Sequence, residues 1–460
     1  MAMKKCNLAF LPADGAGHIA STLEFAKRLL LHPSAAGRLS VTFLLMPVCA
    51  SSFFSLNPPS STTDIAVHLL PDLAVPSRLE TDGGEDYISR VFQLYAPHVK
   101  SALAATAPAA LIIDFFATTV IDAASDLQIP TYVFFSTNAT FLALMLHLPA
   151  LHDEIPEEFE LLQGEIKVPG LAAGIPPKSM PAPLMNKKSR CYTWLVYHGR
   201  RFKDLRGIIT NTLRAFEPQV LSALESDRSV PPVHPVGPVL CLDRGAAGGE
   251  RHECLRWLDA QPAASVVFLC FGSLSRMTEA QAAETAVGIE RSGLRFLWSL
   301  RLVESEGDGR LPAGFREATN GRGMVVVEGW VPQAAVLAHA AVGGFVTHGG
   351  WNSCLESLWF GVPMVTWPMG AEQHLNAMMM SAEMGVAAEM EIDRHRGGWA
   401  TAKEVEMKLN WLMGESEDVR KVRERVREMK VASRAAVEIG GQSYDWLESL
   451  VTEFKRLPEQ

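Results

Sequence analysis

The segment from Gly343 to Trp359 has the sequence GGFVTHGGWNSCLESLW and limits the possible folds more than any other part of the chain. An apolar run is followed by a glycine-rich turn, and apolar residues then recur at helical spacing, so the pattern predicts strand, tight turn and helix. A helix that begins near Trp351 presents backbone N–H groups and the positive end of its dipole. Gly349 and Gly350 let the backbone approach a bulky anion closely. The segment therefore predicts a phosphate-binding turn without a Walker lysine.

The residues around this segment offer what a nucleotide sugar needs. Trp330 provides a flat face for a base, and such stacking contributes roughly 1–3 kcal/mol per base. Glu356, one helical turn beyond Asn352, can accept hydrogen bonds from ribose hydroxyls, and Glu372 with Gln373 can bind sugar hydroxyls. The alternative is an ordinary βαβ unit whose turn glycines serve only geometry. The complete ordered set favours a nucleotide-sugar site.

The stretch from Trp330 to Gln373 carries, in order, Trp, Pro-Gln, His, Gly-Trp-Asn-Ser, Glu, Gly-Val-Pro and an acid followed by Gln. This pattern and its spacing resemble the donor-binding box of plant family 1 UDP-sugar glycosyltransferases, and weaker similarity extends over nearly the whole chain. One departure is Gly349, where the family usually has Cys, and a small residue is kept there. The resemblance implies donor contacts from Ser273, Trp330, Val331, Gln333, His348, Gly350, Trp351, Asn352, Ser353, Glu356, Glu372 and Gln373.

The same resemblance implies the reaction. A sugar is transferred from a UDP-sugar with inversion at the sugar carbon, without a metal ion and without a tightly bound cofactor. Ser273 and His348 are expected to face the diphosphate, and Gln333 the base or ribose. Gln373 as the last residue of the box resembles members that prefer UDP-glucose, whereas galactose users tend to carry His there. The adjacent His374 would reverse that preference if the register shifted by one residue.

Length and composition fit a globular protein of two domains. The chain has 460 residues, and domains of about 200 residues each are expected. The net charge of −9 argues against nucleic-acid or anionic-membrane partners, and no apolar run is long enough to span a bilayer. The scattered cysteines indicate reduced thiols, and the N-terminus lacks a signal peptide. We therefore expect a cytoplasmic protein, and a monomer.

Strands alternate with helices along both halves, which predicts mostly parallel sheets covered on both faces. A Pro- and Gly-rich stretch between the halves reads as a linker. With the resemblance, the fold class is α/β of the GT-B type, two Rossmann-like doubly wound domains facing a cleft. The expected divisions are an acceptor-binding domain at 1–235, a linker at 236–251, a UDP-sugar-binding domain at 252–437, and a C-terminal helix at 438–460 that packs back on the first domain.

The expected strands are Cys6–Leu11, Val41–Val48, Ala66–Leu70, Ala110–Phe116, Thr131–Phe135 and Gly207–Thr212, then Ser265–Phe271, Phe296–Leu300, Met324–Val327, Gly344–Thr347 and Met364–Trp367.

The first strand is followed by Gly15-Ala16-Gly17-His18-Ile19-Ala20, which has the letters of a dinucleotide fingerprint. A dehydrogenase would also need an acidic residue at the end of the second strand, and Val41–Ser51 contains none. The dehydrogenase, and a UDP-sugar epimerase on the same fold, are therefore distant alternatives. In a transferase, His18 would lie beyond the carboxyl end of its strand and remove the proton of the attacking hydroxyl.

A histidine base needs a partner that fixes its tautomer, and Asp114 at the end of an apolar strand is the candidate. Parallel neighbouring strands would bring the two turns together, and the family's His–Asp dyad maps onto His18 and Asp114. Alone, His18 is more often a capping or surface residue, and an Asp at a strand end is often a helix cap. Asp122 and Asp126 are rival carboxylates on the following helix, and Asp114 ranks above them.

The acceptor pocket is less determined by the sequence. An aromatic, Met-rich lining would suit a flat phenolic acceptor such as a flavonoid, although core packing is the alternative for each residue. The hydroxyl that is glycosylated is not specified, and attack by a ring carbon to give a C-glycoside stays open. An inactive nucleotide-sugar-binding protein is the alternative from a different class. The candidate wall residues are Phe115, Phe116, Phe135, Met145, Met185 and Trp194.

Overall fold

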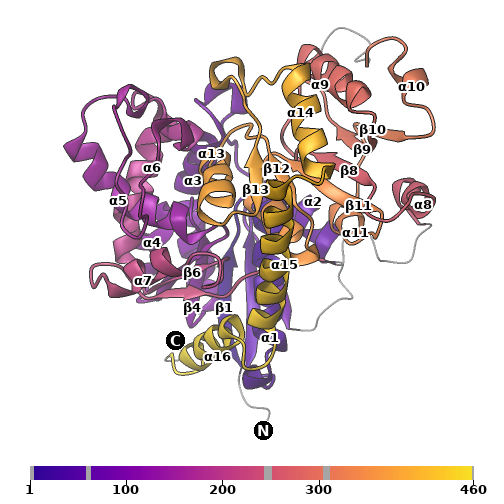
Figure 1. Ribbon diagram of the computed structural model, residues 1–460. Helices are drawn as coiled ribbons and strands as arrows, with labels where there is room; N and C mark the ends of the chain where they lie inside the picture. The colour runs from indigo at the N-terminus through magenta and orange to yellow at the C-terminus, as the bar shows by residue number, and fades with distance from the viewer. Residues whose placement is uncertain (1–4, 58–63, 243–250, 304–310, 458–460) are drawn as a thin grey trace. The chain divides into compact units, whose positions relative to one another are not determined.

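A computed structural model describes residues 5–57, 64–242, 251–303 and 311–457 of the chain. The chain divides into two compact units (Figure 1). Unit 1 comprises Met1–Cys241 and Ala435–Gln460, and unit 2 comprises Leu242–Arg434. The second boundary falls within helix α15 (Glu417–Val437). Of the expected linker at 236–251, residues 243–250 lie outside the described part of the chain.

Unit 1 is built on a parallel sheet whose described strands number seven, in the order β3-β2-β1-β4-β5-β6-β7. The central strands β4, β5 and β6 are buried at every position, so both faces of the sheet are covered, as the continuous apolar runs predict. The strands are β1 (Cys6–Leu11), β2 (Leu39–Leu45), β3 (Ile65–Leu69), β4 (Ala110–Asp114), β5 (Thr131–Phe135), β6 (Gly207–Thr210) and β7 (Val233–Pro235).

Two helices of unit 1, α5 and α6, begin at residues whose side chains accept from the first N–H groups. Asn138 accepts from Phe141 N at 2.7 Å at the start of one helix, and Ser189 accepts from Tyr192 N at the start of another. The helices are α1 (Ala16–Leu31), α2 (Pro47–Leu56), α3 (Gly84–Thr106), α4 (Ile121–Ser125), α5 (Ala139–Glu154), α6 (Arg190–Arg201), α7 (Pro218–Ser226) and α16 (Gln442–Phe454).

Unit 2 repeats the plan with a parallel sheet whose described strands number six, in the order β10-β9-β8-β11-β12-β13. Its strands are β8 (Val266–Cys270), β9 (Arg295–Leu300), β10 (Gly323–Val327), β11 (Val342–Thr347), β12 (Met364–Thr366) and β13 (Ala387–Glu389). Its other helices are α8 (Glu253–Asp259), α9 (Glu279–Ser292), α10 (Phe315–Ala318), α11 (Gln333–Leu337), α12 (Trp351–Phe360), α13 (Gln373–Met378) and α14 (Ala402–Met413).

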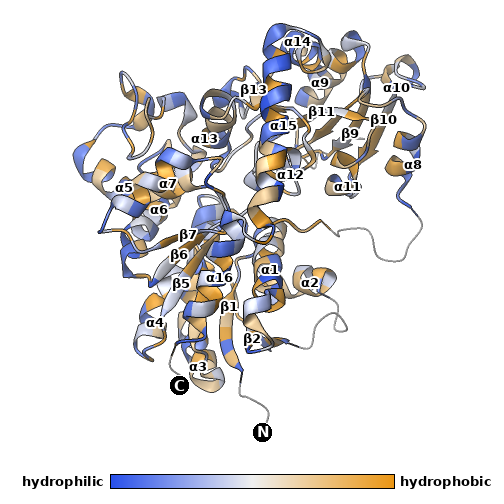
Figure 2. Ribbon diagram, turned by 60° about the horizontal axis from the view of Figure 1, so that its bottom comes forward, coloured by the Kyte–Doolittle hydropathy of each residue, from blue (hydrophilic) through white to orange (hydrophobic). Residues whose placement is uncertain are grey.

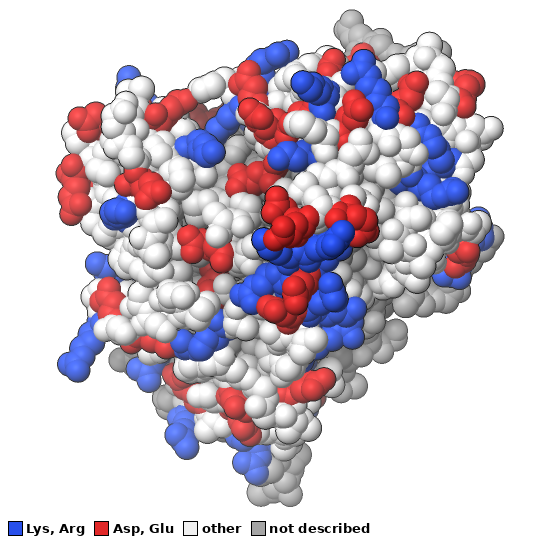
Figure 3. All heavy atoms as spheres, viewed as in Figure 1, with Lys and Arg blue, Asp and Glu red and all other residues white. Residues whose placement is uncertain are grey.

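The core of unit 2 lies between its sheet and the covering helices. Trp298 on β9 and Trp367 after β12 are fully buried, and both belong to an apolar cluster with residues of α9 and α14. Figure 2 shows β9, β10 and β11 in apolar colours, whereas α15 carries hydrophilic faces. Figure 3 shows cationic and anionic side chains interleaved over α15, and they include the pairs Lys421–Glu417 and Arg425–Glu428.

The last helix, α16, packs within unit 1. Leu450, Val451 and Phe454 on its inner face are completely buried. The Phe454 ring meets the ring of Tyr132 on β5 edge-on, with centroids 5.1 Å apart, and the Tyr132 hydroxyl donates to Glu453 Oε1 at 2.6 Å. A residue of β1 also contacts the end of this helix, because Cys6 Sγ donates to the Phe454 carbonyl at 3.3 Å.

The observed strands differ from the expected ones in a few places. The strand expected at Val41–Val48 ends at Leu45, because Pro47 lacks an N–H group for the sheet and occupies the first turn of α2 instead. The strand expected at Ala110–Phe116 ends at Asp114. The strands β7 and β13 were missed, since three-residue strands are too short to show a period.

Candidate active site

The sheet of unit 1 has a topological switch point between β1 and β4. These strands are neighbours and parallel, with Leu11 opposite Ile113, but β2 and β3 continue on one side and β5 to β7 on the other. In open α/β sheets ligands bind beyond the carboxyl ends of the strands at such a point. His18, in the first turn of α1, follows β1, and Asp114 is the last residue of β4.

The two side chains form a hydrogen-bonded pair, in which His18 Nδ1 lies 2.7 Å from Asp114 Oδ2. The Asp114 side chain is completely buried, and its other oxygen, Oδ1, accepts from Phe116 N at 3.0 Å. The His18 side chain is 28% exposed. Because an ionised carboxylate only accepts hydrogen bonds, Asp114 fixes the tautomer with the proton on Nδ1. In that tautomer His18 Nε2 carries the lone pair.

Aromatic residues that follow β4 lie beside this pair. The His18 ring centroid is 5.6 Å from that of Phe115 and 6.0 Å from that of Phe116, and these two rings are 4.2 Å apart. Phe135, at the end of the next strand, lies 4.9 Å from Phe115. The structure thus brings three of the six candidate acceptor residues into one cluster next to His18.

The remaining acceptor candidates lie farther along the chain and differ in accessibility. Met145 on α5 is completely buried, as is Phe135, so both act as packing residues in this structure. Met185 and Trp194 are half-buried. Trp194 is linked to the cluster through His198, whose ring stacks on the indole at 5.8 Å and meets the Phe116 ring edge-on at 5.9 Å.

His198 is a buried residue that the sequence did not single out. Its Nε2 lies 2.9 Å from Ser89 Oγ and its Nδ1 lies 2.7 Å from Thr118 Oγ1. Because Ser89 Oγ donates to a backbone carbonyl of α3, it must accept from Nε2–H, and Thr118 then donates to Nδ1. Burial lowers the pKa of His198 to about 3, so the ring is neutral. The neighbouring Trp194 Nε1 donates to Asp86 Oδ1 at 3.1 Å, which fixes the indole.

The rival carboxylates lie in surface ion pairs. Asp122 pairs with Arg201 at 2.6 Å, and hydrogen bonds from that arginine lower the pKa of Asp122. Asp126 pairs with Lys100 at 2.7 Å. The side chains of Asp122 and Asp126 are 75% and 62% exposed, so neither resembles the enclosed Asp114.

The sheet of unit 2 has its own switch point, between β8 and β11. The turn after β8 carries Gly272 and Ser273, and the turn after β11 carries His348. Gly272 has φ +79°, and a Cβ atom at that position would lie 2.8 Å from the His348 ring. The two turns are therefore in close contact, and glycine is required for it.

The turn after β11 leads directly into α12. Gly350 is the N-cap residue, and a Cβ atom there would lie 2.4 Å from His348 Nε2. Gly349 has φ +78°, which favours glycine over any residue with a side chain. Burial lowers the pKa of His348 to about 4, so the ring is a neutral hydrogen-bonding group at pH 7.

Side chains of α11 and α12 are joined at the same edge of the sheet. Gln333 Nε2 donates to Ser353 Oγ at 3.0 Å and to Glu356 Oε2 at 2.9 Å. Trp330 is 50% exposed, and its ring meets that of His252 edge-on at 6.1 Å. Among the other expected donor residues, Val331 and Trp351 are buried and Asn352 is half-buried.

Glu372 and Gln373 lie at the start of α13. The Gln373 amide oxygen accepts from Met369 N at 2.8 Å and from Gly370 N at 3.0 Å, so its NH₂ group must point away from that turn. Asn376, another residue that sequence reasoning missed, donates to the Gly349 carbonyl at 2.9 Å and to Glu372 Oε1 at 3.1 Å. It ties the turn after β11 to α13. No local signal marks this link, because Gly349 is 27 residues away in sequence.

Among the described residues, no group of three or more His, Cys, Asp or Glu side chains is arranged to hold a metal ion. Within the same ranges, no helix has the length and apolar character required to cross a membrane. All seven cysteines are free thiols.

One doubly wound unit carries the His18–Asp114 pair, and the other carries a glycine-rich turn of the kind that binds nucleotide phosphates. Together they define the class of enzymes that transfer a group from a nucleotide-linked donor. The family model for "UDP-glucoronosyl and UDP-glucosyl transferase" matches residues 228–405. Relatives align over nearly the whole length, and the chain belongs to this family of UDP-glycosyltransferases. The family and the GT-B fold class inferred from the sequence are thereby confirmed.

Three similar proteins illustrate the relationship. Malvidin galactosylase of Oryza sativa subsp. japonica is 40% identical, over 99% of this chain and 98% of the relative. A flavonol 3-O-glucosyltransferase of Arabidopsis thaliana is 38% identical, over 96% of both chains. The structure of a Phytolacca americana enzyme complexed with UDP-2fluoro-glucose and pterostilbene superposes with a TM-score of 0.87 at 32% identity, covering 98% of this chain and 100% of the other.

Proposed function

We propose that this enzyme transfers glucose from UDP-glucose to a hydroxyl group of a phenolic small molecule, with His18 as the general base. The observation that carries the proposal is the hydrogen bond between His18 Nδ1 and the buried Asp114 carboxylate at the switch point of the first sheet. Within this proposal, residues 1–235 bind the acceptor and residues 252–437 bind the donor, while 438–460 return to the first domain. The protein acts as a monomer in the cytoplasm.

The reaction is a single displacement with inversion. The acceptor oxygen forms a bond to the anomeric carbon of the sugar as the bond from that carbon to the diphosphate oxygen breaks. His18 Nε2 takes the hydroxyl proton, and Asp114 stabilises the imidazolium that results. The electron pair of the broken bond leaves with UDP, and no metal ion or redox partner is needed for the balance. A phenol, with a pKa near 10 like that of tyrosine, gives up its proton more readily than an alkyl alcohol.

The donor is bound by the edge of the second sheet. Trp330 stacks on the uracil, Glu356 accepts from the ribose hydroxyls, and its orientation is supported by the hydrogen bond from Gln333. His348 and the first turn of α12 stabilise the negative charge that develops on the leaving diphosphate. The full set of proposed donor residues is Ser273, Trp330, Val331, Gln333, His348, Gly350, Trp351, Asn352, Ser353, Glu356, Glu372 and Gln373.

Glucose is the proposed sugar because of Gln373. With its oxygen held by two backbone N–H groups, this side chain offers its NH₂ group to a sugar hydroxyl, and Glu372 beside it offers an acceptor. The relatives divide on this point, since one is named a galactosylase and another a glucosyltransferase. Family resemblance links Gln at this position to glucose.

A phenolic acceptor is supported by two observations. The rings of Phe115 and Phe116 lie against His18, where a flat aromatic acceptor would need apolar contact. The named relatives act on malvidin and on flavonols, and the related structure contains pterostilbene. All three compounds carry phenolic hydroxyl groups. Trp194, fixed by Asp86, is a further candidate for the acceptor pocket, as is Met185, whereas Phe135 and Met145 lie in the core behind it.

The decisive experiment is a product assay with the purified enzyme, UDP-glucose or UDP-galactose, and a panel of flavonoids and stilbenes, read by mass spectrometry with fragmentation. We expect a hexose to be added from UDP-glucose in preference to UDP-galactose. Fragments that lose a whole hexose would identify an O-glucoside, whereas cross-ring losses would identify a C-glucoside and contradict the proposed oxygen attack. UDP binding without any product would overturn the transferase assignment for these acceptors.

Three variants test the roles of the carboxylates and the base. His18→Ala should lower kcat/KM by about 10²–10⁴-fold while UDP affinity persists. Asp114→Asn should cause a comparable loss, because an amide NH₂ group facing Nδ1 would move the imidazole proton to Nε2 and remove the lone pair. Asp122→Asn is the matched control, since it removes an exposed carboxylate paired with Arg201, and its activity should equal that of the wild type. Wild-type activity in His18→Ala would refute the base assignment.

A further inference from the structure

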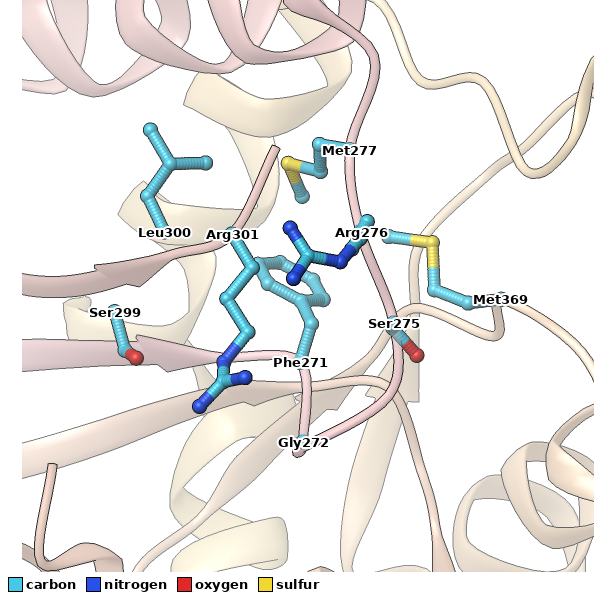
Figure 4. A pocket seen from close by; sticks show the side chains of 9 residues that line it. All are labelled: Phe271, Gly272, Ser275, Arg276, Met277, Ser299, Leu300, Arg301 and Met369. Carbon is cyan, nitrogen blue, oxygen red and sulfur yellow. The ribbon is translucent and has the colours of Figure 1, made fainter. Parts of the chain in front are cut away.

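A small pocket opens at the carboxyl edge of the second sheet, where β8 and β9 end (Figure 4). It contains two arginines that the proposed function does not use. Arg276 enters it from the loop after β8 and Arg301 from the end of β9, with the Phe271 ring drawn between them. The other lining residues are Gly272, Ser275, Met277, Ser299, Leu300 and Met369.

The charge of Arg276 is compensated. Its Nη1 contacts both carboxylate oxygens of Glu328, at 3.2 and 3.1 Å, and donates to the Leu302 carbonyl at 2.6 Å. Glu328 in turn accepts from Leu302 N at 2.6 Å, and this hydrogen bond together with nearby arginines lowers the pKa of Glu328. Arg276 and Glu328 therefore form an ion pair, and both residues also hydrogen-bond to the backbone of Leu302 just beyond β9.

Arg301 is arranged differently. Its Nη1 donates to the Ser273 carbonyl at 3.3 Å, and no carboxylate in the described ranges lies within ion-pairing distance of it. The side chain is half-buried, so its positive charge is only partly screened by water. A half-buried guanidinium beside a backbone turn, with no carboxylate of the described residues in direct contact, is a place where an anion would be stabilised.

The turn that Arg301 contacts is the one that meets His348. Gly272 approaches the His348 ring so closely that a Cβ atom would collide with it, and Ser273 is the next residue. Arg301 thus contacts one of the two turns at the β8–β11 switch point, on the same sheet edge as the proposed diphosphate site. We propose that Arg301 is a positioning residue for the donor diphosphate, which orders the Gly272–Ser273 turn and supplies positive charge beside it.

This inference rests on the proposed function and adds a residue to its donor site. The diphosphate is the part of the donor whose charge increases as UDP leaves, so a nearby fixed cation stabilises the transition state more than the bound donor. Uridine carries no phosphate and would not respond to the cation. The phosphate dependence of binding therefore separates the electrostatic role from simple packing.

The test uses the full-length enzyme and calorimetric titration with UDP, UMP and uridine. Arg301→Gln should weaken UDP binding by about 10-fold, UMP binding by less, and uridine binding not at all. Arg301→Lys should recover most of the UDP affinity, because it keeps the charge. In the transfer assay, kcat/KM for the UDP-sugar should fall in Arg301→Gln by at least as much as the UDP affinity.

Arg295→Gln is the matched control, because Arg295 lies at the opposite end of the same strand and binds Gln261 Oε1 at 2.9 Å. It changes the net charge equally and should leave the ratio of UDP to uridine affinity unchanged. An unchanged ratio in Arg301→Gln, or an equal loss in Arg301→Lys, would overturn the inference. If the wild type itself did not bind UDP, the proposed function would fail first, so the two failures are distinguishable.

Discussion

At the scale of single residues, the turn after β11 contains two glycines that are needed for different reasons. Gly349 has φ +78°, but the atoms nearest to a Cβ there would be 3.6 Å away or more, so space is available and only the backbone conformation is unfavourable. Gly350 has an ordinary φ of −62°, but its Cβ would collide with the His348 ring. Gly349 is therefore needed for its backbone conformation, and Gly350 is needed because it leaves room for the His348 ring.

This difference predicts opposite consequences for two small substitutions. Gly349→Ala should lower the free energy of unfolding by about 1 kcal/mol, the cost of a side chain in the left-handed region, and should change UDP affinity little. Gly350→Ala should displace the His348 ring and weaken UDP binding several-fold. Urea denaturation and UDP titration of both variants check this. A larger loss of UDP affinity in Gly349→Ala than in Gly350→Ala would contradict it.

The residues that sequence reasoning missed also have a physical explanation. His18 and Asp114 were predictable because each follows a buried parallel strand, and parallel neighbours end at the same edge. Arg301 directly follows β9 and could have been found by the same rule. His198 and Asn376 could not, since the contact that matters for each, to Thr118 and to Gly349, joins groups that are remote in sequence.

At the scale of elements, α16 contributes buried side chains to the core of unit 1. Phe454→Ala should cost about 3–5 kcal/mol, because the ring is completely buried against Tyr132 and its removal leaves a cavity. Val431→Ala, on the exposed side of α15, should change stability by less than about 0.5 kcal/mol. Thermal and urea unfolding of the two variants provide the comparison. Equal stabilities would show that α16 is not part of the core.

The sequence predicted most strands because the buried runs are long, apolar and bounded by Gly, Pro or Asp. The prediction failed where a strand was very short, or where a residue lacked the N–H group that a strand needs. The short strands β7 and β13 are recognisable only through their partners β6 and β12. Pro47 shows the second case, since its hydrophobic neighbours suggested a longer strand while its missing N–H group placed it in a helix.

At the scale of the whole molecule, buried neutral histidines make stability depend on pH. Burial lowers the pKa of His198 to about 3 and that of His374 to about 4, where Arg394 adds to the effect. In the unfolded chain a histidine takes up its proton near pH 6.5. Below that pH the unfolded state binds more protons than the folded state. The free energy of unfolding therefore decreases as the pH is lowered, until the pKa of the folded state is reached.

We therefore expect the free energy of unfolding to decrease between pH 6.5 and about 4, by up to about 1.4 kcal/mol per pH unit for each of these histidines. Urea denaturation at a series of pH values measures this slope. His198→Asn, whose amide oxygen can still accept from Thr118, should show a smaller slope even if it is less stable at pH 7. The same slope in the variant and the wild type would refute the assignment.

The return of the chain to unit 1 has a consequence for biosynthesis. The ribosome makes β1 early, but α16, which covers β5 and contacts Cys6, emerges only after the whole of unit 2. At 5–20 residues per second, the nascent first unit waits roughly 10–40 s with the docking face of α16 uncovered. During that interval unit 2 can fold as a continuous segment, whereas the apolar surface that α16 covers stays exposed on unit 1. The first part of the protein to be translated is thus the last to be finished.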